Sequence, residues 1–102
     1  CPEVYATIAE ACARKGDIDG ARNIAQDSMA AVCKFEHYLF YGCALAYAAI
    51  GQYSNEWDDF DTARENADRI DKSNADDAGR AVKAYVAIAR SIAAALSKFE
   101  KG

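Results

Sequence analysis

The sequence predicts an all-helical domain of antiparallel helix pairs, and three observations support this fold class. A length of 102 residues is enough for one hydrophobic core and too short for two. The composition is rich in alanine and contains a single proline, which favours helix over turn-rich β structure. A segment that begins at Tyr5 recurs from Phe40 and, in part, from Tyr85, as expected for a helical repeat.

The first predicted helix pair spans residues 3–35. Its helices are expected near 3–15 and 18–34, where apolar residues recur at helical spacing. Gly16 is expected to end the first helix, because glycine adopts the left-handed conformation that often follows a helix. Asp17 is expected to cap the second helix with its carboxylate.

The second pair spans residues 37–72, with helices expected near 37–50 and 56–72. Gly51 corresponds to Gly16 and is expected to end its first helix, and Asn55 to cap its second. After the glycines, Ala21 and Ala25 match Ala63 and Ala67 only if this pair carries an insertion. A repeat stack also requires the chain to break between residues 34 and 37.

The third, partial copy is a single helix expected near residues 75–99, with Asn74 as its cap. Ile88 and Ala89 keep the step of the repeat, but Leu96 stands where a glycine would fall. The chain is therefore expected to hold about five helices in one domain.

These residues resemble the tetratricopeptide repeat. The match in the first unit comprises Tyr5, Ile8, Ala9, the turn at residues 16–21 and Ala25. The second unit matches at Phe40, Ala44, Tyr47, Gly51, Tyr53, Ala63 and Ala67, with the insertion, and neither unit has the family's closing proline. The resemblance implies a short right-handed superhelix that binds other proteins.

The first unit also resembles a pentatricopeptide unit, a family that binds single-stranded RNA. Ala6, however, follows Tyr5 at a position where a polar side chain would be needed to bind a base edge. The chain has a formal charge of −4 and no cluster of Lys and Arg to neutralise phosphates. Direct nucleic-acid binding is therefore not expected.

The tetratricopeptide resemblance implies that the first helix of each unit lines a groove for a partner. The groove positions are expected at Glu3, Ala6, Glu10, Arg14, Tyr38, Tyr41, Leu45, Lys83, Val86 and Arg90. Aromatic and Arg side chains often dominate interface energy. The alternative is that the tyrosines pack between helices with their hydroxyls at the edge.

The insertion, residues 52–61, is expected to form a loop with three aromatic side chains among carboxylates. The candidate contact residues of this loop and the acidic face beyond it are Tyr53, Trp57, Asp58, Asp59, Phe60, Asp61 and Asp68. Nine acids stand against three bases between Asn55 and Asp77, so this part of the chain is expected to be strongly negative. Alternatively, Trp57 and Phe60 fold back onto the following helix.

We expect neither an enzyme nor a cofactor or metal site. Cys33 and His37 are four residues apart and Cys43 is near, but a closed metal site needs a fourth ligand. No nucleophile elbow or phosphate-binding glycine loop is present in the sequence. Four cysteines are too few for a disulfide scaffold, so we expect reduced thiols. Cys1 is consistent with an added residue, with a residue left after removal of Met, or with the mature start of a lipoprotein.

The sequence therefore predicts a protein-interaction module that is cytoplasmic, has no membrane span and is able to self-associate through the exposed ends of its short stack. The alternative is an acidic decoy, whose negative surface occupies a basic site on another protein.

Overall fold

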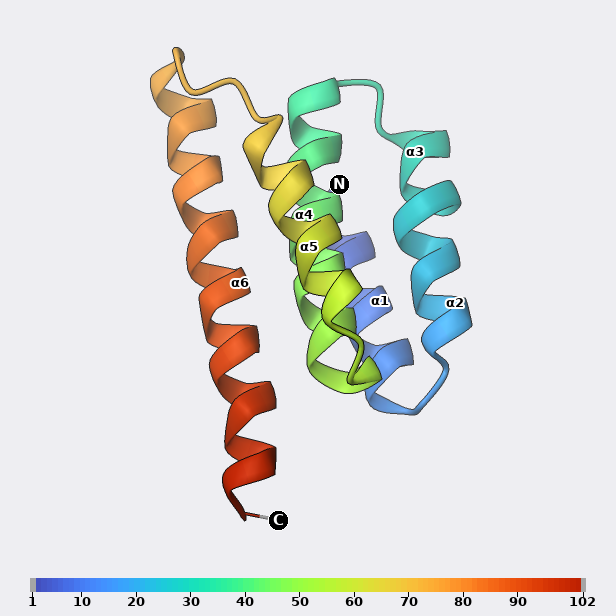
Figure 1. Cartoon of the computed structure of the whole chain (residues 1–102). Helices are drawn as coiled ribbons and strands as arrows, with labels where there is room; N and C mark the ends of the chain where they lie inside the picture. The colour runs from blue at the N-terminus through green and yellow to red at the C-terminus, as the bar shows by residue number, and fades with distance from the viewer. Residues whose placement is uncertain (1, 102) are drawn as a thin grey trace.

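The computed structural model describes residues 2–101, and Cys1 lies outside them. These residues confirm an all-helical chain of five helical rods (Figure 1). The helices are α1 (Pro2–Arg14), α2 (Ile18–Asn23), the π-helical turn η1 (Ile24–Ser28), α3 (Met29–Val32), α4 (Glu36–Ser54), α5 (Trp57–Asp68) and α6 (Ala75–Lys101). The second rod is α2, η1 and α3 in succession.

The turn between α1 and α2 has the local chemistry that its sequence predicts. Gly16 adopts a left-handed conformation with φ of 96°. The Asp17 carboxylate accepts a hydrogen bond of 2.9 Å from the backbone N–H of Gly20 and so caps α2. Both predictions for this turn are confirmed.

The second rod widens to a π-helical turn where it meets α4. The backbone N–H of Met29 donates to the carbonyl of Ile24, five residues earlier. The Cys43 thiol of α4 lies 3.3 Å from the Ala25 carbonyl, and Gln26 donates a 2.7 Å hydrogen bond to the Tyr47 hydroxyl. Two α4 side chains therefore bond to the wide turn.

The predicted break before α4 is confirmed, because residues 33–35 are not helical. The predicted end of α4 at Gly51 is wrong. The helix continues to Ser54 and ends at Asn55, whose φ of 60° is left-handed. Asn55 therefore follows the end of α4 instead of capping α5, and the residue before α5 is Glu56.

Gly51 has a packing role instead. A Cβ atom added there would lie 2.7 Å from the ring of Phe60, which is 4% exposed. The absence of a side chain lets the ring of Phe60 pack directly on α4. The predicted insertion is thus not a loop: most of it belongs to the last turn of α4 and the first turns of α5.

α5 ends at Asp68, earlier than predicted, because the chain turns away towards α6. The Lys72 ammonium bonds to the carbonyls of Ala67, Asp68 and Ile70 at the end of this helix. Asn74 accepts hydrogen bonds from the backbone N–H groups of Asp76 and Asp77, as predicted for the cap of α6.

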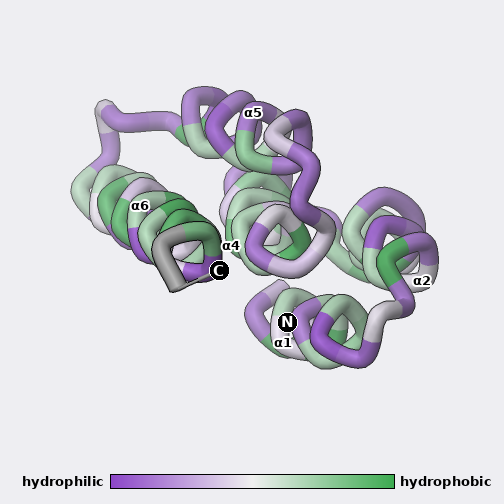
Figure 2. The backbone as a smooth tube through the Cα atoms, turned by 60° about the horizontal axis from the view of Figure 1, so that its bottom comes forward, coloured by the Kyte–Doolittle hydropathy of each residue, from purple (hydrophilic) through white to green (hydrophobic). Residues whose placement is uncertain are grey.

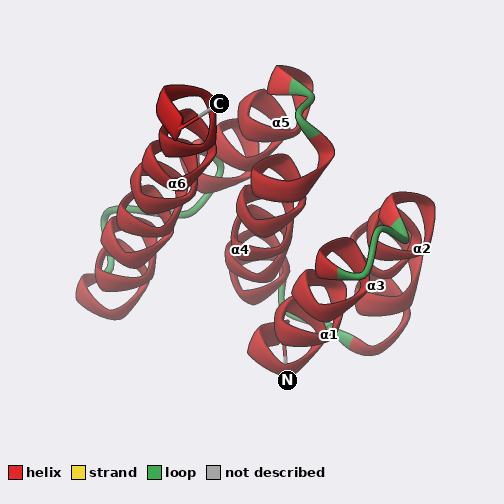
Figure 3. Cartoon of the chain, turned by 90° about the horizontal axis from the view of Figure 1, so that it is seen from below, coloured by secondary structure: helices red, strands yellow, loops and turns green. Residues whose placement is uncertain are grey.

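The helices form two layers, with α1, α4 and α6 in one, and α5 and the rod of α2, η1 and α3 in the other, where they make no extensive contact (Figures 2 and 3). α4 is central and packs on α1, α5 and α6, whereas α1 and α6 make no extensive contact with each other. Alanines dominate the core and permit this close packing. No helix among the described residues is both long and apolar enough to cross a membrane.

Candidate functional site

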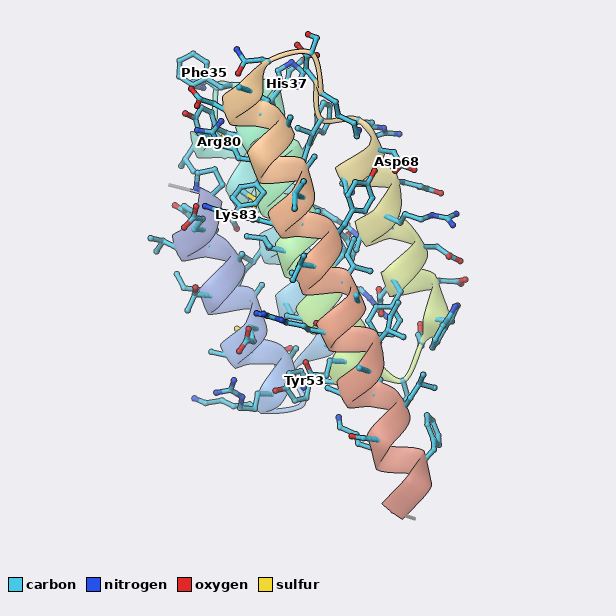
Figure 4. The ribbon with its side chains drawn as sticks, turned by 90° about the vertical axis from the view of Figure 1, so that its left-hand side faces the viewer. Phe35, His37, Tyr53, Asp68, Arg80 and Lys83 are labelled. Carbon is cyan, nitrogen blue, oxygen red and sulfur yellow. The ribbon has the colours of Figure 1, made fainter. Side chains whose placement is uncertain are left out.

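A groove runs along α4 between α1 and α6, and two hollows lie within it. One has a volume of about 260 Å³ and the other about 330 Å³, and Glu3 lines both. Figure 4 views the molecule from the α6 side and shows Arg80 and Lys83 along the edge of α6 towards α1. We call this surface the α4 groove.

Small apolar side chains form the floor of the first hollow. Leu45, Ala48 and Ala49 come from α4, and Ala6 and Ala87 from the flanking helices. The rim is polar, with Glu3, Thr7 and Glu10 on α1 and Ser91 on α6. An apolar floor with a polar rim is the usual composition of a site for a peptide side chain.

Tyr38 and Arg80 form a contact at one end of the α4 groove. The Arg80 guanidinium lies 4.2 Å from the centre of the Tyr38 ring and donates a 2.8 Å hydrogen bond to its hydroxyl. Arg80 also pairs with Asp77 at 2.8 Å. This end therefore combines an aromatic ring with an ion pair.

Tyr53 lies at the other end, between cations of both flanking helices. The Arg14 Nε of α1 donates to its hydroxyl at 3.3 Å, and the Lys98 ammonium of α6 lies 4.8 Å from its ring centre. Lys98 also donates to the Gln52 carbonyl at 2.8 Å. These contacts connect α1 and α6 through α4 at this end.

The two tyrosines set the length of the groove. Tyr38 and Tyr53 both belong to α4, and the helical rise places them about 22 Å apart along the axis. An extended peptide covers that distance with about seven residues. The groove therefore matches a short linear segment in length.

Opposite charges face each other in the second hollow. Glu3 of α1 and Lys83 of α6 both line it and are exposed, and neither forms a salt bridge with a described residue. Tyr41 also lines this hollow, and its pKa is raised, first by burial and then by the negative charge of Glu3. The hollow therefore offers two carboxylates, Glu3 and Asp76, and one ammonium group, Lys83, that form no salt bridge with a described residue.

The structure brings together most of the predicted groove residues. Glu3, Glu10, Tyr41, Leu45 and Lys83 line the hollows, and Arg14 and Tyr38 lie at the ends. Val86 and Arg90 are exposed but do not line either hollow. Tyr41 is only 6% exposed, so it also fits the alternative in which a tyrosine packs between helices.

α6 contributes a different face from the one that the repeat alignment predicts. Arg80, Ala87 and Ser91 line the groove with Lys83, whereas the alignment on Tyr85 selects Lys83, Val86 and Arg90. Ala81, Ala84 and Ile88 form the buried stripe of this helix. The helical spacing of these buried residues can be found in the sequence, and it predicts that Arg80 and Ala87 lie next to the buried face.

The predicted insertion and acidic face divide into buried and exposed residues. Asp59 and Phe60 are 5% and 4% exposed, so the expectation that they form part of an exposed contact surface is wrong. Trp57 is 54% exposed and packs edge-on against Phe60, with 5.2 Å between ring centres. Phe60 thus folds back as the alternative predicts, whereas Trp57 remains largely in solvent.

Four exposed carboxylates form one stripe along the outer side of α5. They are Asp58, Asp61, Glu65 and Asp68, spaced three, four and three residues apart. Asp68 accepts a hydrogen bond from the Tyr85 hydroxyl of α6, which raises the pKa of Tyr85. We call this surface the acidic stripe.

Among the described residues, Cys33, His37 and Cys43 do not bring three ligand atoms together. Cys43 bonds to Ala25 and Cys33 to the Phe35 carbonyl at 3.5 Å, while Cys12, Cys33 and Cys43 are free thiols. His37 lies instead beside Asp71 and Asp77, and the ligand atoms of these three residues are within 4.8 Å of one another.

Comparison with known proteins finds no matching family model, no matching curated protein and no matching solved structure.

Proposed function

We propose that this protein is an interaction module that holds a short peptide segment of a partner in the α4 groove. The observation that supports this proposal is the composition of the groove: one hollow has an apolar floor, and the second hollow carries Glu3, Asp76 and Lys83 without salt bridges. Buried apolar contact supplies affinity in such a site, and the charged pair selects orientation.

The proposal includes a tetratricopeptide-like arrangement of the helices. In this arrangement α1 pairs with the rod of α2, η1 and α3, α4 pairs with α5, and α6 is the first helix of a third unit. Two features support it: α1, α4 and α6 share one layer, and the groove lies on that layer. A tetratricopeptide stack likewise uses the first helix of each unit to line its groove.

The charges of the groove define the ligand. Lys83 would pair with a carboxylate of the peptide and Glu3 with a Lys or Arg side chain. An apolar side chain next to these two groups would occupy the other hollow, over Leu45 and Ala48. We therefore expect an extended ligand of about seven residues that carries both charges next to an apolar residue.

Selection from a random peptide display library tests this proposal, with a matched pair of variants on α6. Lys83→Glu reverses a charge inside the groove, and Arg90→Glu makes the same change outside it. We expect wild type and Arg90→Glu to enrich the same peptides, and Lys83→Glu to bind them at least tenfold more weakly. Equal loss in both variants, or no enrichment by wild type, would contradict the groove.

A double charge reversal sharpens the test. Glu3→Lys combined with Lys83→Glu exchanges the two charges across the hollow. We expect this double variant to select peptides in which the acidic and basic positions are exchanged. If it selects the wild-type sequences, charge pairing does not orient the ligand.

The acidic stripe supports a second candidate function, a decoy that occupies a basic site on another protein. The helical rise spaces its four carboxylates along about 15 Å of α5, on the side away from the core. A contact of this kind loses affinity steeply as salt rises, whereas a groove contact depends on salt much less. A partner whose binding is unchanged by Asp58→Asn, Asp61→Asn and Glu65→Gln together would exclude the decoy.

Self-association remains part of the proposal, and the outer side of α6 is the candidate surface. Val82, Val86 and Leu96 are 61%, 42% and 48% exposed and follow one line along this helix. Light scattering at high protein concentration tests the idea. We expect Val86→Glu to prevent a second copy from packing on this surface. A wild-type protein that is monomeric at high concentration would contradict self-association.

A further inference from the structure

We infer that His37, Asp71 and Asp77 form a binding site for a divalent transition-metal ion of the Zn²⁺ class. The ligand atoms of the three residues lie within 4.8 Å of one another, and all three residues are half-buried. The set offers one imidazole nitrogen and two carboxylate oxygens, which are donors that Zn²⁺ accepts.

The three ligands come from separate segments that the fold brings together. His37 belongs to the first turn of α4, Asp71 to the linker after α5, and Asp77 to the first turn of α6. Figure 4 shows His37 at the end of the molecule where this linker crosses, near Phe35 and Arg80. An ion here would join α4 and α6 through the linker.

Other contacts already orient each ligand. One Asp71 oxygen accepts from the Ser73 hydroxyl at 2.7 Å, and one Asp77 oxygen accepts from Arg80 at 2.8 Å. The second oxygen of each carboxylate has no hydrogen bond from a described residue. Partners of this kind hold the ligands of a metal site in position.

The imidazole is also positioned. The His37 ring packs edge-on against Phe40, with 6.2 Å between ring centres. Its Nδ1 accepts a long hydrogen bond of 3.3 Å from the backbone N–H of Asp71, so the lone pair of this nitrogen faces the linker. A metal ion that takes Nδ1 would replace only this one long bond.

The geometry requires a small closure. Ligand atoms held about 2.0–2.2 Å from a tetrahedral ion are about 3.3 Å apart, so rotations of the three side chains would bring them into place. A hollow of about 330 Å³ opens beside His37 and Asp77 and provides access and room for water. Three protein ligands with water in the remaining position is the composition of an open zinc site.

The charge balance favours a cation. Asp71 and Asp77 supply two carboxylates, and the Arg80 guanidinium forms a salt bridge with Asp77 alone. His37 is the sole histidine of the chain, so its ring signals report on this site alone.

Zn²⁺ titration of the full, reduced chain tests the site by calorimetry and by proton NMR of the His37 ring. We expect one ion per chain, with saturable shifts of both ring signals. We expect His37→Gln to abolish this binding, and Asp71→Asn and Asp77→Asn each to weaken it at least tenfold. Glu36→Gln changes a carboxylate that lines the same hollow but lies outside the ligand set. The Zn²⁺ affinity of this variant should therefore stay within threefold of the wild-type affinity.

Thiols are the main competing ligands and need their own control. Cys1→Ser combined with Cys33→Ser should retain the NMR shifts, and circular dichroism should show that every variant is folded. The inference is overturned if the His37 signals do not move up to about 1 mM Zn²⁺, an affinity of roughly 4 kcal/mol. It is also overturned if binding survives His37→Gln or disappears with the cysteines.

Discussion

Arg22 of α2 and Asp59 of α5 form a salt bridge of 2.7 Å that joins the two helices of the outer layer. The Arg22 Nε also donates to the other Asp59 oxygen at 3.1 Å, and the Asp59 side chain is only 6% exposed. Ser54 donates a third hydrogen bond to this carboxylate at 2.6 Å. The pKa of Arg22 is raised, mainly by its hydrogen bonds to Asp59, so the guanidinium stays charged.

Asp59→Ala should therefore destabilise the fold. The change leaves the Arg22 charge without its main partner and lowers the free energy of unfolding by about 2–3 kcal/mol, as expected when one member of a largely buried pair is removed. Urea denaturation measures the effect. Glu56→Gln is the control, because Glu56 also pairs with Arg22 at 3.0 Å but is 62% exposed, and its loss should cost less than about 1 kcal/mol.

Two glycines in helices should respond to alanine in opposite ways. Gly51→Ala places a Cβ atom 2.7 Å from the Phe60 ring and should lower stability by about 1–3 kcal/mol. Gly79→Ala meets no atom within 4 Å and should raise stability by about 0.5–1 kcal/mol through helix propensity. Thermal unfolding of both variants checks the signs. A destabilised Gly79→Ala would mean that the start of α6 is not helical.

Replacing Asn55 by glycine should preserve stability, whereas replacing it by alanine should lower stability. Its φ of 60° places it in the left-handed region that ends α4. Asn55→Ala should lower stability by about 1 kcal/mol, because alanine adopts this conformation less readily than asparagine. Asn55→Gly should be neutral or slightly stabilising. Equal losses in the two variants would indicate that the Asn55 side chain matters more than its backbone conformation.

Cys43 should be protected from alkylation. Burial raises the pKa of its thiol from the ordinary 9.0 to about 11, so at pH 8 about a hundredfold less thiolate is available. Mass spectrometry after treatment with iodoacetamide should find Cys43 unmodified in the native protein and modified in urea. Rapid native modification would contradict its burial against Ala25.

The same shift gives stability a defined pH dependence. A pKa that is higher in the folded state than in the unfolded state means that the folded chain retains its proton between pH 9 and about 11. The contribution of Cys43 is therefore complete below pH 9 and is lost as pH rises towards 11. Cys43→Ala should make the free energy of unfolding fall less steeply with pH in this range. If the pH dependence is unchanged in this variant, it comes from tyrosines instead of Cys43.

Helix positions could be predicted from the sequence where a local signal specifies them. Gly16 with Asp17, and Asn74 before α6, carry turn and cap chemistry that does not depend on the rest of the fold. Gly51 misled the prediction because a glycine that ends a helix and a glycine that makes room for a ring look the same in sequence. Only the position of Phe60 on the neighbouring helix distinguishes them.

The site residues also divide into those that local sequence specifies and those that depend on distant segments. Glu3 and Glu10 line the first hollow, and their helix begins close to the expected residue. The neighbours of His37 could not be found, since Asp71 and Asp77 are more than thirty residues away and meet it only when the linker crosses α4. Asp59 was expected on the surface because nothing in its local sequence indicates Arg22 as a partner.

α4 contacts every other helix of the described chain, and this central position has a consequence for motion in the native state. Because α1 and α6 contact each other little, either can separate from α4 while the other stays in place. We therefore expect the amide hydrogens of α4 to exchange only when the whole chain unfolds, and those of α1 and α6 to exchange through partial opening. The width of the groove would then change when α1 or α6 moves, whereas the fold is lost only when α4 itself unfolds.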